Sequence, residues 1–229
     1  MEALKIISML LSYPEEELIT HQTELCDAVS ELKLSIENKA RIMQVVDQLI
    51  SQCLFDSQES YINTFDRGRS CSLLMFEHVH GQSRDRGQAM IDLLNLYESK
   101  GLELNARELP DYLPLFLEFL SVCDEAQAIH WLKDMAPILE LIEERLRARE
   151  SIYSSLFTVL LDLSEHSRNA QLAKTVAQEK PDDTPEAIEA VWEEEAVRFM
   201  DAQQQQSCSS TYKPAPTQQV ADVVRVPLN

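Results

Sequence analysis

Glycine is nearly absent from this chain, and its scarcity restricts the available folds more than any other feature. Only four of the 229 residues are glycine. Tight β-hairpin turns depend on glycine, because it adopts backbone conformations that other residues avoid. Residues that favour helices, namely Leu, Glu, Ala and Gln, are plentiful instead. The composition therefore favours helices over strands.

Apolar residues recur at helical spacing through the first two hundred residues. One such stripe consists of Ile42, Val45, Val46, Leu49 and Ile50. We expect one all-α domain over residues 1–201, a helical bundle of about nine or ten helices, since helices average about 11 residues. Residues 202–229 have no stripe and contain three prolines and Ser-rich stretches, so we expect a disordered tail there.

Capping signals mark the expected ends of several helices. Ser35 and Thr184 precede helical stripes and can act as N-caps, and Asp56 with a Glu three residues later is typical of a capping box. Gly101 is well placed to end a helix. Pro137 predicts the start of a new helix, because proline is tolerated in the first turn.

The stretch 65–92 differs most from the rest of the chain. It holds three of the four glycines and two Asp-Arg-Gly tripeptides, and residues 65–87 carry four arginines against three acids in a chain of net charge −19. Residues 71–79 are apolar on every side of a helical wheel, which predicts a buried helix. Glu77 on that helix then needs a partner, because an unpaired buried charge is costly. Gly87, inside the next helix, predicts the close approach of another backbone.

The charged residues of this stretch are its candidate pairing partners. We expect Glu77 to be at least partly buried and paired with one of the arginines. The residues assigned a structural or anion-pairing role are Asp66, Arg67, Arg69, Arg84, Asp85 and Arg86.

Catalytic and metal-binding motifs are not found in the sequence. The five cysteines include no Cys-x-x-Cys pair and are odd in number, which argues against a zinc or iron–sulfur site and against a disulfide framework. His78 and His80 are two residues apart, so a helix would point them to different sides, and we expect no metal site. Neither a dinucleotide-binding glycine motif nor a P-loop occurs, and no nucleophile elbow is present. These patterns favour a protein without catalytic activity.

The acidic balance limits the possible partners. Phosphate would repel a surface of this charge, so nucleic acid is an unfavourable partner and a basic partner is favoured. Residues 1–5 lack the basic start of a signal peptide, and no apolar run is long enough to span a membrane. With no disulfide framework expected, we predict a soluble cytoplasmic protein without stable membrane insertion.

Several long motifs carry a resemblance to a known family. They read F-D-R-G-R at 65–69, L-L-M-F-E-H-V-H-G at 73–81, S-R-D-R-G-Q-A-M at 83–90, R-E-L-P-D-Y-L-P-L-F-L-E-F-L at 107–120, D-M-A-P-I-L at 134–139 and D-D-T-P-E-A-I-E-A-V-W-E-E-E at 182–195. The chain resembles the respiratory nitrate reductase delta subunit (NarJ) family of molybdenum cofactor assembly chaperones. The resemblance covers residues 1 to about 200.

The resemblance implies an all-helical cytoplasmic chaperone that is not part of the final enzyme. Members of the family bind the apo catalytic (alpha) subunit of nitrate reductase, within its alpha–beta complex and notably through its N-terminal segment. They hold this subunit back from the membrane until the molybdenum cofactor and an iron–sulfur cluster are in place. The cofactor belongs to the client, and none is implied for the chaperone.

The client site is expected at a groove. Wider relatives carry a Glu-Pro-x-Asp-His-type motif at the peptide site. The matching stretch here, residues 108–112, differs by the inserted Leu109 and by Tyr112 in place of His. Asp111 is therefore the first residue to which the resemblance assigns a role at the client site. We expect the groove between a helix at 76–80 and a helix at 112–120, with the histidines adding a pH dependence. Its predicted residues are Phe76, Glu77, His78, His80, Asp111, Tyr112, Leu115 and Phe116.

Two other functions remain open at this point. The Arg-Gly segment 66–87 could serve a nucleotide- or anion-binding maturation factor, since Arg84 and Arg86 are expected near a helix N-terminus. A permanent subunit of a membrane complex is the third possibility.

Overall fold

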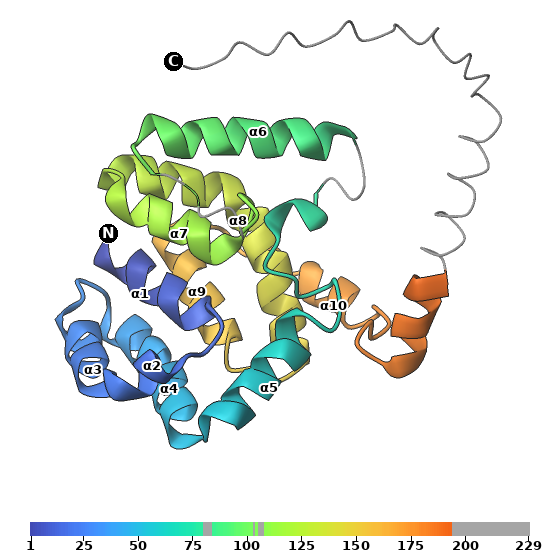
Figure 1. Ribbon diagram of the computed structural model, residues 1–229, viewed down its shortest axis with the longest axis horizontal. Coiled ribbons are helices and arrows are strands. Elements are labelled where there is room, and N and C mark those ends of the chain that lie inside the picture. The colour runs from blue at the N-terminus through green and yellow to red at the C-terminus, as the bar shows by residue number, and fades with distance from the viewer. Residues whose placement is uncertain (80–83, 103, 105–107, 194–229) are drawn as a thin grey trace, which may run out of the picture. The chain divides into compact units, whose positions relative to one another are not determined.

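The computed structural model describes residues 1–79, 84–102, 104 and 108–193, without the side chains of 84 and 85 (Figure 1). Residues 1–188 form one compact unit. Its labelled elements are α1 (Glu2–Leu11), α2 (Glu16–Thr20), α3 (Gln22–Glu31), α4 (Ile36–Ser51), α5 (Leu54–Phe65), the 3-10 helix η1 (Met75–Glu77), α6 (Arg84–Ser99), α7 (Leu113–Val122), α8 (Glu125–Ala148), α9 (Ser154–Leu163) and α10 (Leu172–Val176). Every regular element in these ranges is a helix, which confirms the predicted all-α class.

The last described residues continue this helical character. Residues 185–193 are helical, and Ala187 N donates to Thr184 Oγ1 at 3.2 Å, which confirms Thr184 as an N-cap. Residues 189–193 belong to a second unit that spans 189–229. The predicted domain boundary at 201 and the predicted disordered tail lie outside the described residues.

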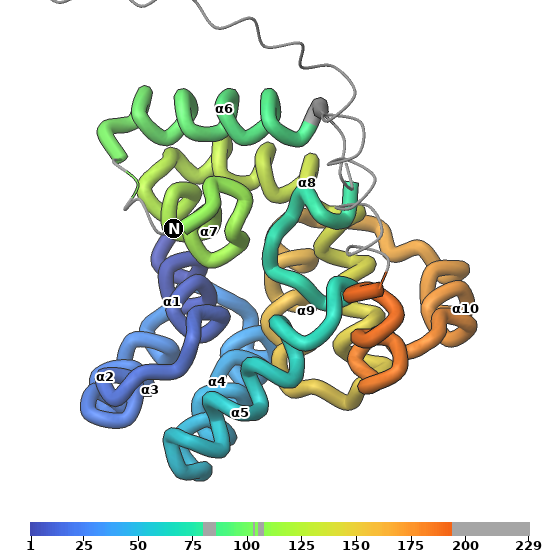
Figure 2. Tube along the Cα trace, turned by 45° about the vertical axis from the view of Figure 1, so that its right-hand side comes forward, coloured from blue at the N-terminus to red at the C-terminus, as the bar shows by residue number. Residues whose placement is uncertain are grey.

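The core of the first unit is built from long helices packed in pairs. α1 packs on α7, α9 packs on both α8 and α4, and the side chains of Leu4, Leu117, Leu132 and Leu160 are fully buried. Each such side chain stabilises the fold by about 1.5–3 kcal/mol relative to exposure. In two views turned by 45°, α6 lies alongside α7 and α8 at one edge of the unit (Figures 1 and 2).

Local capping signals predicted several helix ends correctly. Ser35 Oγ accepts from Asn38 N at 3.1 Å and caps α4. Gly101 has a φ of +76° just beyond α6; its N–H donates to Glu98 O, and the next N–H donates to Tyr97 O. This is the Schellman arrangement, and it requires a residue that tolerates positive φ.

Two local predictions are wrong. The N-cap of α5 is Cys53, whose Sγ accepts from Asp56 N at 3.4 Å. Asp56 therefore lies in the first turn, where its negative charge interacts favourably with the helix dipole. Gly87 has no close neighbour, since a Cβ built there would meet nothing within 4 Å. The expected backbone approach at Gly87 does not occur among the described residues.

The helix predicted at 71–79 is wrong because the backbone there pairs with a distant segment. Leu113 N donates to Leu73 O at 2.8 Å, and Met75 N donates to Asp111 O at 3.0 Å, around an isolated antiparallel bridge between Leu74 and Tyr112. These bonds engage backbone groups that a helix would use internally. Only η1 remains helical, so the expected helical wall at 76–80 is a short 3-10 turn where the structure describes it.

Pro137 does not start a helix but lies inside α8. A proline in a helix interior lacks the N–H for the carbonyl four residues before it, at a cost of about 3 kcal/mol. Ala136 and Leu139 beside it are fully buried. Packing of this long helix in the core therefore offsets the local cost, and the two helices predicted around Pro137 are one.

Within the described part of the chain, no helix combines the length and the apolar character that crossing a membrane requires.

Candidate functional site

An apolar groove of about 360 Å³ lies between α6, α7, α8 and η1. This volume falls within the range typical of ligand pockets. The groove is lined by Met75 and Phe76 from η1, by Ala89, Asp92, Leu93 and Leu96 from α6, by Phe116 from α7, and by Trp131 and Met135 from α8. Among these described residues Asp92 alone is charged. We call this feature the apolar groove.

Helical spacing explains why these side chains converge. Ala89 and Leu93 are one turn apart on α6, and Trp131 and Met135 are one turn apart on α8. The Phe116 ring meets Trp131 edge-on, with ring centroids 6.3 Å apart and an angle of 87° between the planes. Such a contact contributes about 0.5–1.5 kcal/mol beyond area burial. The aromatic pair therefore fixes the wall that α7 and α8 share.

The backbone around Asp111 holds the η1 side of the apolar groove. Met75 N donates to the Asp111 carbonyl at 3.0 Å, and Phe76 N donates to its carboxylate Oδ2 at 3.1 Å. Asp111 thus anchors both η1 residues of the lining. Its own side chain is fully buried, so it supports the groove from behind and is not exposed at the groove surface.

The buried carboxylate of Asp111 has few partners. Arg86 Nη2 lies 3.7 Å from Oδ2, and Oδ1 has no hydrogen-bond partner among the described residues. Burial raises the pKa of Asp111, although the bond from Phe76 N and the charge of Arg86 oppose the shift. The carboxylate is therefore costly to keep ionised in the folded chain.

Glu77 pairs with an arginine of its own stretch, as the sequence predicted. Arg86 Nη1 lies 3.8 Å from Glu77 Oε1, and the Glu77 side chain is 24% exposed. The same guanidinium therefore lies between Glu77 and Asp111. Both contacts are longer than a hydrogen bond, so the group acts as a charge shared by two carboxylates.

Two further predicted groove residues take part in other contacts. The Tyr112 hydroxyl lies 3.0 Å from the Tyr61 hydroxyl, and Tyr61 donates to Leu11 O at 3.0 Å, so Tyr112 ties α7 to α5 and α1. Leu115 packs partly buried against the core and is not part of the groove lining. Of the predicted groove residues, Phe76 and Phe116 line the groove.

His78 is held between two polar groups. Its Nε2 lies 2.8 Å from Ser72 O, and its Nδ1 lies 3.5 Å from Arg145 Nη1. A carbonyl accepts and a guanidinium donates, so the neutral ring carries its hydrogen on Nε2. Burial lowers the pKa of His78. His80 lies outside the described residues, and no cluster of His, Cys, Asp and Glu suited to a metal occurs within them.

The predicted anion-pairing residues lie in several different environments. Asp66 ends α5, and burial raises its pKa, while Arg67 and Arg69 are exposed. The side chains of Arg84 and Asp85 lie outside the described residues. Arg86, whose side chain is described, forms ion pairs with both carboxylates of the site, Glu77 and Asp111.

The α6 and α8 walls of the apolar groove were not predicted from the sequence. The residues concerned are Ala89, Asp92, Leu93, Leu96, Trp131 and Met135. A signal for the α8 wall was present, because Trp131 and Met135 form a large apolar pair one turn apart beside a fully buried stripe. What the sequence lacked was the placement of that pair opposite α6.

Comparison with known proteins gives consistent matches. The family described as nitrate reductase delta subunit matches residues 22–159. The chain is 48% identical over 198 residues to the nitrate reductase molybdenum cofactor assembly chaperone NarJ of Escherichia coli K12, covering 86% of this chain and 84% of that protein. It is 45% identical to the probable chaperone NarW of the same strain (88% and 85% covered) and 32% identical to the probable chaperone NarJ of Bacillus subtilis 168 (70% and 86% covered).

An all-helical unit with an apolar groove, similar over most of its length to proteins named as assembly chaperones, defines the class: an assembly chaperone and not a catalytic enzyme. Within that class, the chain belongs to the nitrate reductase delta subunit family.

Proposed function

We propose that this chain is a client-specific assembly chaperone for respiratory nitrate reductase. It binds the apo catalytic (alpha) subunit within the alpha–beta complex, including the N-terminal segment of that subunit. It holds the subunit for insertion of the molybdenum cofactor before membrane attachment, and it leaves before the enzyme is complete. The cofactor is cargo for the client and is not a resident group of the chaperone.

The observation that carries this proposal is the apolar groove. Its lining is apolar apart from Asp92, and several of its side chains, among them Phe76 and Trp131, are only half-buried. A groove of this kind suits the apolar face of an amphipathic helix. Burial of apolar surface would supply most of the affinity, at about 25 cal/mol per Å².

Charge supports a basic client segment. The chain carries a formal charge of −19, and Asp92 lies in the groove lining. A helix with an apolar face and basic flanks would meet the groove on one side and the acidic surface on the other. The charge mainly raises the association rate, while apolar contact sets dissociation.

The rival function, an anion- or nucleotide-binding factor using residues 66–87, has weaker support. The Asp182 carboxylate accepts from Ser70 N and from Ser70 Oγ, both at 2.7 Å. The loop that follows the first Asp-Arg-Gly thus already binds an anion, and that anion belongs to the chain itself. A nucleotide phosphate would have to displace it.

The setting follows from the client. We place the chaperone in the cytoplasm, where it meets the apo subunit before membrane attachment, with no nucleic acid partner. A permanent subunit role would instead leave the chain in the mature membrane enzyme. Fractionating that enzyme and probing for this chain separates the two possibilities.

The test is co-expression with the alpha and beta subunits of the nitrate reductase from the same organism. In cells unable to make the molybdenum cofactor, we expect the chain to co-purify with the alpha–beta complex. Deleting the N-terminal segment of the alpha subunit should weaken this association. Supplying the cofactor should release the chain.

Retention of the chain in the active membrane-bound enzyme would contradict the proposal. Binding and hydrolysis of nucleotide by the purified chain, with no client present, would favour the rival.

A further inference from the structure

Two sequence motifs 112 residues apart meet in the structure. Asp182 of the D-D-T-P-E motif lies against Gly68 and Ser70 of the D-R-G-R-S motif. A Cβ built on Gly68 would lie 2.7 Å from Asp182 Oδ1, closer than side chains tolerate. The Asp182 carboxylate occupies the space of a side chain at position 68, which explains the glycine there. The proposed groove alone does not account for this contact between the two motifs.

Two arginines at the end of α8 complete the contact. Arg149 Nη2 donates to Asp182 Oδ1 at 2.5 Å and to Ser70 Oγ at 2.7 Å. Arg145 forms a two-pronged pair with Glu179, at 2.8 and 2.9 Å, and donates from Nη1 to Ser70 O at 3.0 Å. Such bidentate, charge-assisted bonds are strong and geometrically specific. We call Arg145, Arg149, Glu179 and Asp182 the clasp.

The loop of residues 70–78 joins the clasp to the apolar groove. The clasp holds its first residue, Ser70, and its later residues Met75 and Phe76 line the groove. Ser70 is bonded to three members of the clasp, and Arg145 also faces His78, which is bonded to Ser72 O. Beyond these contacts, the same loop is bonded to Asp111 through Met75 N and Phe76 N. A short segment fixed at both ends leaves Phe76 little freedom.

We propose that the clasp residues are positioning residues for client binding, because they hold the 70–78 loop so that Phe76 stays in place in the apolar groove. The inference rests on the proposed function of that groove. None of the clasp residues is part of the groove lining, so they act through the loop and not through contact with the client.

The experiment compares two matched substitutions, Asp182→Asn and Asp162→Asn. Asp162 also pairs with arginines, Arg41 at 3.3 Å and Arg168 at 3.8 Å, but its partners do not contact the loop. The probe is a synthetic peptide copying the N-terminal segment of the nitrate reductase alpha subunit. We expect Asp182→Asn to raise the Kd by up to about tenfold, as loss of a charge-assisted hydrogen bond would. Asp162→Asn should leave the Kd unchanged.

A second measurement separates positioning from general destabilisation. In a Phe76→Ala background, Asp182→Asn should have no further effect on the Kd, because the residue through which it acts is gone. Trp131→Ala serves as the reference for the groove, and urea unfolding of every variant shows whether it is folded.

The outcomes distinguish the two proposals. Two results would leave the groove standing and show that the clasp inference is wrong, provided that Trp131→Ala weakens binding. In the first, Asp182→Asn leaves the Kd unchanged. In the second, Asp182→Asn raises the Kd by the same factor with and without Phe76→Ala. If Trp131→Ala and Phe76→Ala both leave binding unchanged in folded chains, the groove proposal fails and the clasp inference fails with it.

Discussion

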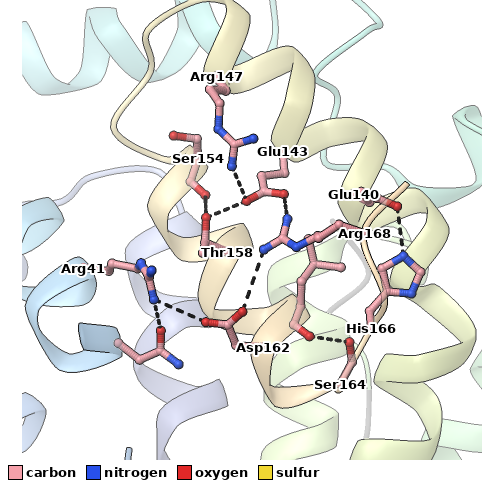
Figure 3. A network of polar contacts seen from close by, with 12 residues as sticks. Arg41, Glu140, Glu143, Arg147, Ser154, Thr158, Asp162, Ser164, His166 and Arg168 are labelled. Carbon is pink, nitrogen blue, oxygen red and sulfur yellow. Dashed lines mark hydrogen bonds and ion pairs between the residues drawn. The ribbon is translucent and has the colours of Figure 1, made fainter. Parts of the chain in front are cut away.

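Glu143 and Asp111 are both fully buried carboxylates, yet their surroundings differ completely. Glu143 accepts from Arg147 Nη2 at 2.8 Å and from Thr158 Oγ1 at 2.5 Å, and it contacts Arg168 (Figure 3). The Asp111 carboxylate accepts one hydrogen bond, from Phe76 N, and lies 3.7 Å from Arg86 Nη2. Its Oδ1 has no partner among the described residues.

The difference separates scaffold from site. A network with every member satisfied makes one arrangement strongly preferred, and the Glu143 network joins α8, α9 and the segment after α9 in that way. A buried group with an incomplete set of partners lowers stability, and such groups concentrate where a protein functions. Asp111 lies directly behind the apolar groove. The free energy that its burial costs is offset there by a function, because its carboxylate holds Phe76 in place through Phe76 N.

The largest expected effect is at Glu143. Glu143→Ala should reduce the free energy of unfolding by about 2–3 kcal/mol, because it removes the buried acceptor of charge-assisted bonds, while Arg147 and Arg168 are partly exposed and keep other carboxylate partners. Urea unfolding measures the change, and Glu143→Gln serves if the alanine variant does not fold. A loss comparable to that of an exposed pair would remove the distinction between the two carboxylates.

Asp111→Asn should cost much less, about 1 kcal/mol. The neutral amide keeps an acceptor for Phe76 N and removes a charge whose ionised form is disfavoured by burial. The same urea titration applies, together with binding of the client peptide. If Asp111→Asn unfolds as readily as Glu143→Ala, the two carboxylates are equivalent parts of the scaffold.

Glu77→Ala should cost about 1 kcal/mol or less, the usual contribution of a partly exposed ion pair. Arg86 keeps Asp111 as a partner when Glu77 is removed. A loss of several kcal/mol would mean that the charge shared between Glu77 and Asp111 is essential to the fold. An unchanged unfolding free energy with lost client binding would place Glu77 at the client site.

The smallest effect concerns pH and His78. Burial lowers the pKa of His78 below the unfolded value of about 6.5, so protons bind the unfolded chain better. The stability tied to His78 is therefore complete above about pH 6.5 and is lost as the pH falls through that value toward the lowered pKa. His78→Gln, which cannot titrate, should lose less stability between about pH 7 and pH 5.5 in urea unfolding. Equal losses in both chains would assign the pH dependence to other groups.

Local chemistry made the helical class predictable. Ser35, Thr184 and Gly101 interact with residues within a few positions, so their caps could be read from neighbouring residues. The Glu77 ion pair followed from burial and a nearby arginine. These predictions held because every contact they required lay within a short segment.

Predictions that needed distant partners were not accessible from the sequence. The apolar run at 71–79 has a helical pattern, but its backbone bonds to Asp111 and Leu113. The Asp182–Ser70 contact joins motifs that no local rule connects. The groove was expected between two segments, and Phe76 and Phe116 do line it, yet six of its nine lining residues come from α6 and α8.

The most direct test of the groove measures peptide kinetics for Leu96→Glu and Ile36→Glu. Leu96 lines the apolar groove, whereas Ile36 is an apolar residue exposed elsewhere, at the start of α4. In folded chains, Leu96→Glu should speed dissociation of the client peptide by tenfold or more, since about 1.4 kcal/mol of lost apolar contact is tenfold. Ile36→Glu should leave dissociation unchanged. For the native chain, added salt should slow association and leave dissociation nearly unchanged. Binding that tolerates Leu96→Glu and disappears in moderate salt would contradict the groove and indicate a purely electrostatic surface contact.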